Sequence, residues 1–215
     1  MPKRGVFISL EGGEGVGKST QGALLQEAIE ARWGKCLRTR EPGGSMYAEE
    51  IRDVILHSDH AGQANAFTMF ELFWAARTDH VARTVLPALS RGLHVITDRF
   101  DGTTYSHQIW GQECFELSSL FYLKRETYLQ DKNACPNLYI FLDMDPEEGL
   151  RRVARRTHEP TNHFDERELD FHKRLRKGCH AFAELFHGVL INADQDVQKV
   201  HEDIMRAIEG RKIFL

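Results

Sequence analysis

The sequence predicts an α/β fold in which a parallel five-stranded sheet is flanked by helices on both faces. Two features of the chain lead to this prediction. Short apolar runs alternate with longer segments of helical periodicity, as strands and helices do in parallel sheets. Glycine-rich or charged residues follow several of the apolar runs, at the carboxyl ends of the expected strands, where such sheets bind their ligands.

The strands are predicted at residues 6–10, 36–40, 93–97, 138–142 and 189–192. Helices are predicted at residues 19–32 and 48–56, and a long helix over about residues 65–90. Further helices are expected from Pro146, from about Phe164 and from Asp194. The side of the long helix that faces the core is marked by an apolar stripe: Phe67, Phe70, Trp74, Val81, Val85 and Leu89.

Composition limits the class of protein. The 215 residues suit one domain, 1–215, with a single buried core. A formal charge of −4 gives no sign of a nucleic-acid-binding surface. No apolar run approaches the roughly 18 residues of a membrane span, and the amino terminus has no small-residue cleavage site of a signal peptide. The four cysteines lack metal-ligand spacing, so we expect free thiols and a cytoplasmic location.

A phosphate-binding loop (P-loop) follows the first predicted strand. The pattern G-x-x-x-x-G-K-[ST] is complete, and it opens a predicted helix, as the motif requires. Its glycines let backbone N–H groups turn toward phosphate oxygens at a helix N-terminus. Lys18 is expected on the β- and γ-phosphates of ATP, and the Ser19 hydroxyl on Mg²⁺. The predicted ATP-binding residues are Gly12, Gly13, Glu14, Gly15, Val16, Gly17, Lys18, Ser19 and Thr20.

A second set of charged residues lies at neighbouring strand ends. Arg40 ends the second predicted strand, and Asp98 and Arg99 follow the third. Because these ends lie close to the P-loop in a parallel sheet, Arg40 and Arg99 are placed to hold the phosphate of a second substrate by bidentate contacts. Asp98 is placed to hold Mg²⁺ or its waters. The sequence therefore predicts a kinase with two phosphate-binding groups of residues.

One face of the long helix carries a candidate base-binding pair. Phe73 and Arg77 are four residues apart and share a helical face. An aromatic ring beside a forked donor suits a planar base. The ring stacks on the face of the base, and the guanidinium donates hydrogen bonds to its edge. Phe73 taken alone also fits a core position, so the pair indicates a base-binding site only in combination with the other motifs.

With these motifs, the chain resembles the thymidylate kinase family. The resemblance rests on the P-loop, on Thr-Arg-Glu-Pro-Gly-Gly at residues 39–44, on Phe-Trp-Ala-Ala-Arg at 73–77 and on Asp-Arg-Phe at 98–100. It extends over the strand-to-lid segment from Pro136 to Arg152. It implies a P-loop NTPase fold with a short helical lid at about residues 151–165, transfer of the ATP γ-phosphate to dTMP, and a homodimer through helices that include the long one.

The resemblance also implies roles for single residues. It assigns Arg40 and Arg99 to the dTMP phosphate, Phe73 to stacking on thymine, and Arg77 and Gln108 to the base pocket. Glu14 resembles the family carboxylate that meets the sugar 3′-hydroxyl. Because Gly15 stands where some members carry a catalytic arginine, the chain resembles the bacterial type. In that type the lid supplies this arginine. Arg152 and Arg156 match the lid pattern, with Arg155 near but out of register.

The chain departs from the family pattern at two places. Asn162 and His163 stand where the lid usually has Asp-Arg, and His107 stands where a tyrosine is common. The alternatives are a kinase of another nucleoside monophosphate or of a deoxynucleoside, and a nucleotide-dependent switch without turnover. A deoxynucleoside acceptor would not need two arginines committed to a phosphate, and a switch would show no turnover with any acceptor.

Overall fold

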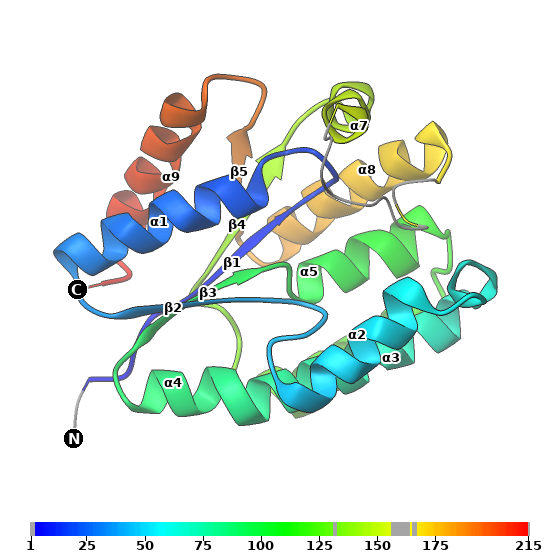
Figure 1. Cartoon of the computed structure of the whole chain (residues 1–215), viewed down its shortest axis with the longest axis horizontal. Helices are drawn as coiled ribbons and strands as arrows, with labels where there is room; N and C mark the ends of the chain where they lie inside the picture. The colour runs from blue at the N-terminus through cyan, green and yellow to red at the C-terminus, as the bar shows by residue number, and fades with distance from the viewer. Residues whose placement is uncertain (1–2, 131–132, 156–163, 165–166, 215) are drawn as a thin grey trace.

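The computed structural model describes residues 3–130, 133–155, 164 and 167–214. Its centre is one sheet of five parallel strands in the order β2-β3-β1-β4-β5. The strands are β1 (Phe7–Gly12), β2 (Cys36–Arg40), β3 (His94–Asp98), β4 (Leu138–Asp143) and β5 (Val189–Asn192). Figure 1 shows helices on both faces of this sheet. The predicted fold class and all five strands are confirmed.

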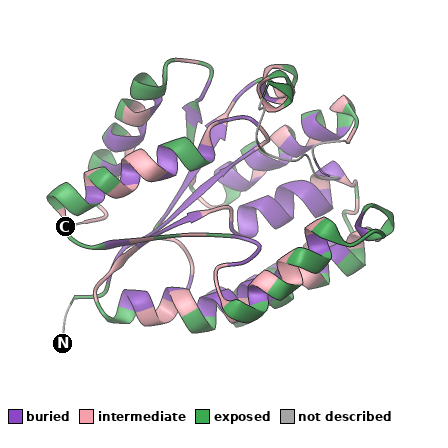
Figure 2. Ribbon diagram, in the orientation of Figure 1, coloured by how far each residue is buried: buried purple, intermediate pink, exposed green. Residues whose placement is uncertain are grey.

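Side chains alternate along the strands between two hydrophobic cores. Phe7 and Phe141 face one core, whereas Ile8 and Ile140 face the other, as the two-residue period of a strand requires. The isoleucine side is covered by α1 (Lys18–Arg32) and α9 (Val197–Arg211). The phenylalanine side is covered by a larger group of helices, so the strands are buried from above and below (Figure 2).

The helices on the phenylalanine side come from four parts of the chain. They are α3 (Ala66–His80) with η2 (Val81–Val85) and α4 (Leu86–Ser90), then α5 (Asp101–Thr104) with η3 (Tyr105–Gly111), then α6 (Leu117–Arg125) with η4 (Glu126–Gln130), and α8 (Leu169–Leu185). Outside this layer, α2 (Met46–His57) packs on α3, with η1 (Ala61–Gln63) between them in the chain. The helix α7 (Pro146–Ala154) follows β4.

The long predicted helix is present as one run, α3–η2–α4, whose middle turn is π-helical. Asn65 caps it, since its side chain accepts a hydrogen bond from the backbone N–H of Thr68 at 2.8 Å. One member of the predicted apolar stripe is wrong: Phe67 is 50% exposed, because it lies in the first turn, away from the sheet.

Two further predictions differ from the structure. The helix expected from about Phe164 begins at Leu169, because Phe164 instead joins a small apolar cluster with α2 and α3. The segment between Asp101 and Gln130 carries the helices α5–η3 and α6–η4, for which no element was predicted. The run α5–η3 is almost entirely buried (Figure 2), so it lacks the polar face that gives an amphipathic period.

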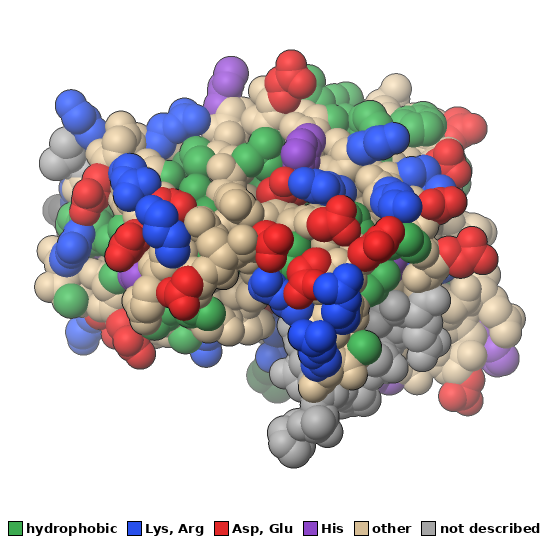
Figure 3. Space-filling view, turned by 90° about the horizontal axis from the view of Figure 1, so that it is seen from above, with side chains coloured by type: hydrophobic (Ala, Val, Ile, Leu, Met, Phe, Trp, Pro, Cys, Tyr) green, Lys and Arg blue, Asp and Glu red, His purple; other side chains and the backbone are tan. Residues whose placement is uncertain are grey.

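The carboxyl ends of the strands meet at one edge of the sheet. There β1 leads into the P-loop, β2 ends at Arg40, and β3 ends at Asp98. On the face seen from above in Figure 3, lysine and arginine side chains are interspersed with acidic ones. Within the part of the chain that the structure describes, no helix is both long and apolar enough to cross a bilayer.

Candidate active site

The P-loop connects β1 to α1 and surrounds the Lys18 ammonium. Gly17, with φ at 90°, turns the chain into α1 through the left-handed region that favours glycine. Lys18 Nζ donates to the carbonyl oxygens of Gly12 at 3.2 Å and Gly13 at 2.6 Å. Burial, followed by the charge of Arg99, lowers the pKa of Lys18 below its usual value. The ammonium is therefore an incompletely neutralised cation, ready to pair with phosphate oxygens.

Ser19 and Asp98 meet as predicted from the strand ends. The Ser19 hydroxyl donates to Asp98 Oδ2 at 3.0 Å across the edge of the sheet. A hydroxyl oxygen beside a carboxylate oxygen suits Mg²⁺, which prefers hard oxygen ligands and keeps several waters. Within the described ranges, no group of three or more His, Cys, Asp or Glu side chains forms a self-sufficient metal site. The pair fits a metal whose remaining ligands are water and phosphate.

A cleft of about 880 Å³, open to solvent, lies beside the P-loop. Its walls come from the P-loop, the turn after β2, α2, α3, the end of β3 and η3. The residues that line it are Glu14, Gly15, Gly17, Lys18, Ser19, Thr20, Glu41, Pro42, Arg52, Leu56, Phe73, Asp98, Arg99, Thr103, His107 and Phe164. We call this space the acceptor cleft, because it offers room for a second substrate next to Lys18.

Arg99 and Glu14 form the floor of the acceptor cleft. Arg99 Nη2 lies 2.5 Å from Glu14 Oε1, and Arg99 Nη1 donates to the carbonyl of Gly12 at 3.0 Å. Burial opposes the charge of Glu14, but Arg99, followed by His107 and Lys18, holds the pKa of this carboxyl well below its usual value. Glu14 is therefore ionised at neutral pH. The backbone φ of Arg99 is 71°, a strained value for a residue with a side chain.

A second arginine in the cleft, Arg52, was missed by the sequence analysis. It lies on α2, and its Nη1 donates to the carbonyl of Pro42 at 2.8 Å. Burial lowers the pKa of Arg52, and the charges of Arg40 and Arg99 lower it further. These arginines thus form a cationic cluster that an anion would stabilise. The available signal was an arginine on the helix that directly follows the turn at residues 41–44.

The structure does not bring Arg40 and Arg99 into one cleft. Arg40 lines a neighbouring hollow on the other side of Lys18 and Asp98. Its Nη2 forms an ion pair with Glu49 Oε2 at 2.9 Å, and its side chain is largely exposed. The physical reason is the period of the strand: Arg40 is the last residue of β2, and its side chain projects away from the face on which Arg52 and Arg99 converge.

The far end of the acceptor cleft is aromatic. Phe73, predicted to stack on a base, lines the cleft together with His107 and Phe164. The ring centroids of Phe73 and Phe164 lie 6.1 Å apart, and those of His107 and Phe164 lie 5.8 Å apart. The planes of these ring pairs are inclined by 55° and 83°, so the rings pack against one another and form an aromatic end to the cleft. We call this end the aromatic slot, and its ring faces and edges suit contact with a flat heterocycle.

Two predicted base-pocket residues lie behind this slot and do not line it. Arg77 is buried, and it donates to Glu41 Oε2 at 2.8 Å and to the carbonyl of Phe100 at 2.9 Å. Gln108 is fully buried. Among the described residues, neither amide atom of Gln108 nor Nη1 of Arg77 has a hydrogen-bond partner. Each therefore keeps unused hydrogen-bonding capacity close to the cleft.

His107 faces Glu14 from the aromatic end. Its Nδ1 lies 2.9 Å from the carbonyl of Thr103, and its Nε2 lies 4.0 Å from Glu14 Oε1. Burial lowers the pKa of His107 to about 4, despite the carboxylate nearby. The imidazole is therefore neutral at physiological pH, and with Nδ1–H donated to Thr103 it presents a lone pair on Nε2 toward the cleft.

Arg152, one of the predicted lid arginines, stands apart from the acceptor cleft. Arg152 contacts Glu148 Oε1 at 3.2 Å and Asp194 Oδ1 at 3.2 Å, so its guanidinium is directed to the loop after β5. Arg155 is exposed at the end of α7. Arg156, like residues 157–163, lies outside the described residues. Arg152 is thus not in the catalytic position that was predicted for it.

Comparisons with known proteins agree with this geometry. The profile of the family "Thymidylate kinase" matches residues 10–204. Thymidylate kinases of Bacillus cereus (strain Q1) and Bacillus anthracis (strain CDC 684 / NRRL 3495) are each 35% identical over 210 residues, covering 97% of this chain and 99% of the relative. The crystal structure of thymidylate kinase from Ehrlichia chaffeensis has the same fold, with a TM-score of 0.75, 24% identity, and coverage of 96% of this chain and 99% of that one.

Proposed function

The chain belongs to the thymidylate kinase family of ATP-dependent nucleoside-monophosphate kinases, and on that premise we propose that it transfers the γ-phosphoryl group of ATP to dTMP. The products are dTDP and ADP. One observation carries the proposal: a single cleft joins the P-loop lysine, Lys18, to a pair of arginines and then to an aromatic slot. This order matches the order of a γ-phosphate, an acceptor phosphate and an acceptor base along the reaction axis.

In this proposal Arg52 and Arg99 hold the acceptor phosphate. Their guanidinium groups flank the cleft between the P-loop and the slot, and planar forks bind phosphate oxygens in a bidentate manner. Arg99 keeps donors for this task beyond those it gives to Glu14 and Gly12. The charge of Arg40, which lies close enough to depress the pKa of Arg52, strengthens the field at the acceptor phosphate.

The remaining contacts orient the nucleoside. Phe73 stacks on thymine, and Arg77 and Gln108 supply unused polar atoms behind the slot. Glu14 lines the cleft between phosphate and base positions as an ionised acceptor, which suits the sugar 3′-hydroxyl. Proximity and alignment then bring the acceptor oxygen in line with the γ-phosphorus, which is the larger part of catalysis in phosphoryl transfer.

Charge stabilisation completes the mechanism. Lys18 neutralises charge on the transferring group from inside the P-loop. Ser19 and Asp98 would hold Mg²⁺, which would supply positive charge to the phosphates. A lid arginine adds the last positive charge when the lid closes, and we assign this task to Arg156, with Arg152 in support. The direction of Arg152 toward Asp194 means that closure must first release that ion pair.

We also propose that the protein is a cytoplasmic homodimer. All four cysteines are free thiols, which suits a reducing compartment. Exposed apolar side chains lie on the outer helix pair: Tyr47 and Val54 on α2 and Phe67 on α3. A second copy would cover this surface, so sedimentation should give twice the mass of the chain, and the triple change to Ser, Asp and Ser should give a monomer.

A kinase of another nucleoside monophosphate, or of a deoxynucleoside, is the competing function. The deciding experiment measures ADP release from ATP and Mg²⁺ with dTMP, dUMP, dCMP, thymidine or no acceptor. We expect rapid turnover with dTMP and little with thymidine, because thymidine leaves the arginine pair without its anion. ADP release at the same rate without any acceptor would indicate an ATPase, and no ADP release with any acceptor would indicate a switch. Either result would contradict the proposal.

A further inference from the structure

The tip of the P-loop lies directly against the helix that leads to the lid. Glu14 and Gly15 form this tip, and Gly149 lies in the middle of α7. In Figure 1 the loop after β1 passes next to the first turns of α7. The contact is between backbones, because two of its three residues have no side chain.

This contact leaves no room for a single methyl group on either side. A Cβ at Gly149 would stand 2.4 Å from the carbonyl oxygen of Glu14. A Cβ at Gly15 would stand 2.1 Å from the carbonyl oxygen of Gly149, and φ of Gly15 is +73°. Carbon and oxygen atoms in contact are normally at least about 3.3 Å apart. Any side chain at Gly149 therefore forces α7 and the P-loop apart.

The contact joins two sites that are otherwise separate. The side chain of Glu14 forms the floor of the acceptor cleft with Arg99, while its backbone carbonyl oxygen lies against α7 at Gly149. No described residue of α7 lines the acceptor cleft. An event in the cleft that moves Glu14 can thus reach α7, and with it Arg152, through the backbone of this one residue.

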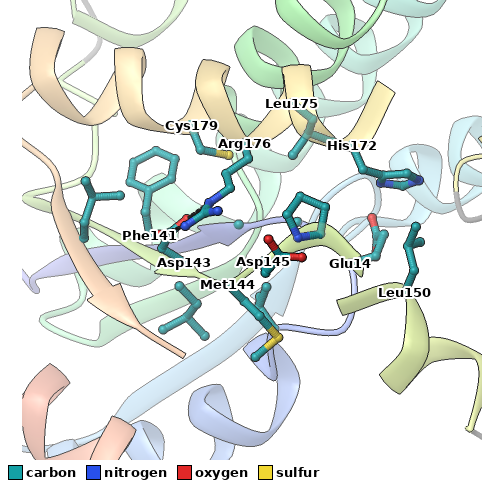
Figure 4. Close-up of a pocket in the computed structure, with 16 residues that line it drawn as sticks. Glu14, Phe141, Asp143, Met144, Asp145, Leu150, His172, Leu175, Arg176 and Cys179 are labelled. Carbon is teal, nitrogen blue, oxygen red and sulfur yellow. Dashed lines mark hydrogen bonds and ion pairs between the residues drawn. The ribbon is translucent and has the colours of Figure 1, made fainter. Parts of the chain in front are cut away.

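The rest of α7 is only lightly held. Asp145 caps its first turn through the N–H of Glu147, and Arg152 ties its last turn to Asp194. Between α7, the P-loop and α8 lies a hollow of about 430 Å³ that opens to solvent. Figure 4 shows Leu150 of α7 and Leu175 and Cys179 of α8 around this hollow, with Glu14 at its edge. Around this hollow α7 faces α8 through side chains, whereas its contact with the P-loop is made by backbone atoms.

We propose that Gly149 is a positioning residue. Because it has no side chain, α7 contacts the backbone of Glu14 and Gly15, and the helix and the floor of the acceptor cleft therefore move together. The inference rests on the proposed function for the identity of the acceptor, and adds the route by which acceptor binding prepares the lid. Because coupling between two sites is reciprocal, nucleotide binding that draws α7 down also stabilises the position of Glu14.

The test is Gly149→Ala, with Gly210→Ala as the matched control. Both glycines lie in helices, so alanine raises the helix propensity of each, but a Cβ at Gly210 meets nothing within 4 Å. We expect Gly149→Ala to lower kcat about 10–100-fold, the scale for a displacement of roughly 1 Å at the reacting groups. The KM for dTMP should change less than about 3-fold, and the melting temperature should stay within about 4 °C of the control. The wild-type kcat in Gly149→Ala would overturn the inference.

A second measurement does not depend on the stability of that variant. Hydrogen–deuterium exchange on the wild-type chain with dTMP alone should increase protection in α7, although no described residue of that helix lines the acceptor cleft. The helix α9 serves as the internal control and should not respond. Protection in the P-loop without any change in α7 would overturn the inference. A wild-type chain that neither binds nor phosphorylates dTMP contradicts the proposed function instead.

Discussion

The floor of the acceptor cleft and the arm that leads to the lid are built in opposite ways. On the floor, Lys18, Arg99 and Glu14 are held by short contacts to one another and to P-loop carbonyls. On the arm, Arg152 is directed away from the cleft toward Asp194. The charges of the floor are thus in place without a ligand, whereas in the proposed mechanism the charge of the lid arginine has to be brought in.

The preformed floor has an energetic consequence. Lys18 and Arg52 both have pKa values lowered by burial and by neighbouring cations. Cations held together in this way destabilise the empty protein and are stabilised by phosphate oxygens, so part of the binding energy of an anion is built into the fold. Arg152, by contrast, is paired with Glu148 and Asp194 at the surface.

The largest effect is expected from substitution of the lid arginines. Arg156→Ala should lower kcat by about 10³–10⁵, the range for an arginine that stabilises a transferring phosphoryl group. Arg152→Ala should lower kcat less, because Arg152 lies further from the lid tip. Affinity for dTMP, measured by calorimetry, should hardly change in either variant. Wild-type kcat in both variants would show that the lid arginines do not contribute to catalysis, which would then depend on the residues of the floor alone.

A somewhat smaller effect is expected on the floor itself. Lys18→Ala should cost about 3–4 kcal/mol of transition-state stabilisation, the scale for one preorganised electrostatic contact. The change in kcat/KM from stopped-flow kinetics measures this value directly. Near-normal turnover would mean that the P-loop positions ATP without stabilising its transfer, and would contradict the mechanism.

Features that local sequence patterns determine could be predicted from the sequence, whereas features that depend on long-range packing could not. The strands and the P-loop were predictable because local patterns determine them: apolar runs end in glycine or charge at the sheet edge. Arg52 was not, since its role depends on the angle at which α2 crosses the end of β2. The buried helices α5–η3 were missed because residues such as Asp101 and Gln108 are polar yet buried. The position of Asp101 is fixed by a long-range partner, since it forms an ion pair with Arg125 at 2.9 Å.

A third variant examines the aromatic slot. Phe73→Ala should weaken dTMP binding by about 1–3 kcal/mol, the scale for stacking of a base on an aromatic ring, while ATP affinity remains nearly unchanged. Phe73 also packs in a small apolar cluster with Phe164 and Met69. A melting curve therefore accompanies the titration, and a collapsed fold with no separate binding effect would identify Phe73 as a core residue only.

The smallest expected effect concerns stability and pH. Burial raises the pKa of Glu11 to about 7, although Thr103 and Ser9 donate hydrogen bonds to its carboxyl. The folded chain thus holds a proton that the unfolded chain has released, so this group lowers stability as pH rises from about 4.5 to 7 and above. Glu11→Gln should therefore raise the free energy of unfolding by about 1–2 kcal/mol at pH 8.5 and by nothing at pH 4.5. An equal gain at both pH values would contradict the assigned pKa.

The measurement closest to the central claim compares dTMP with thymidine in binding to the floor. Calorimetry on the wild-type chain should show dTMP bound at least about 100-fold more tightly, because charge-assisted bonds to the phosphate contribute about 1.5–3 kcal/mol each. Arg52→Ala should reduce this difference by about 10-fold or more, whereas Arg40→Ala, whose side chain lines the neighbouring hollow, should reduce it only about 3-fold through its longer-range charge. Equal affinities for dTMP and thymidine in the wild-type chain would contradict the claim that this cleft holds a nucleoside monophosphate.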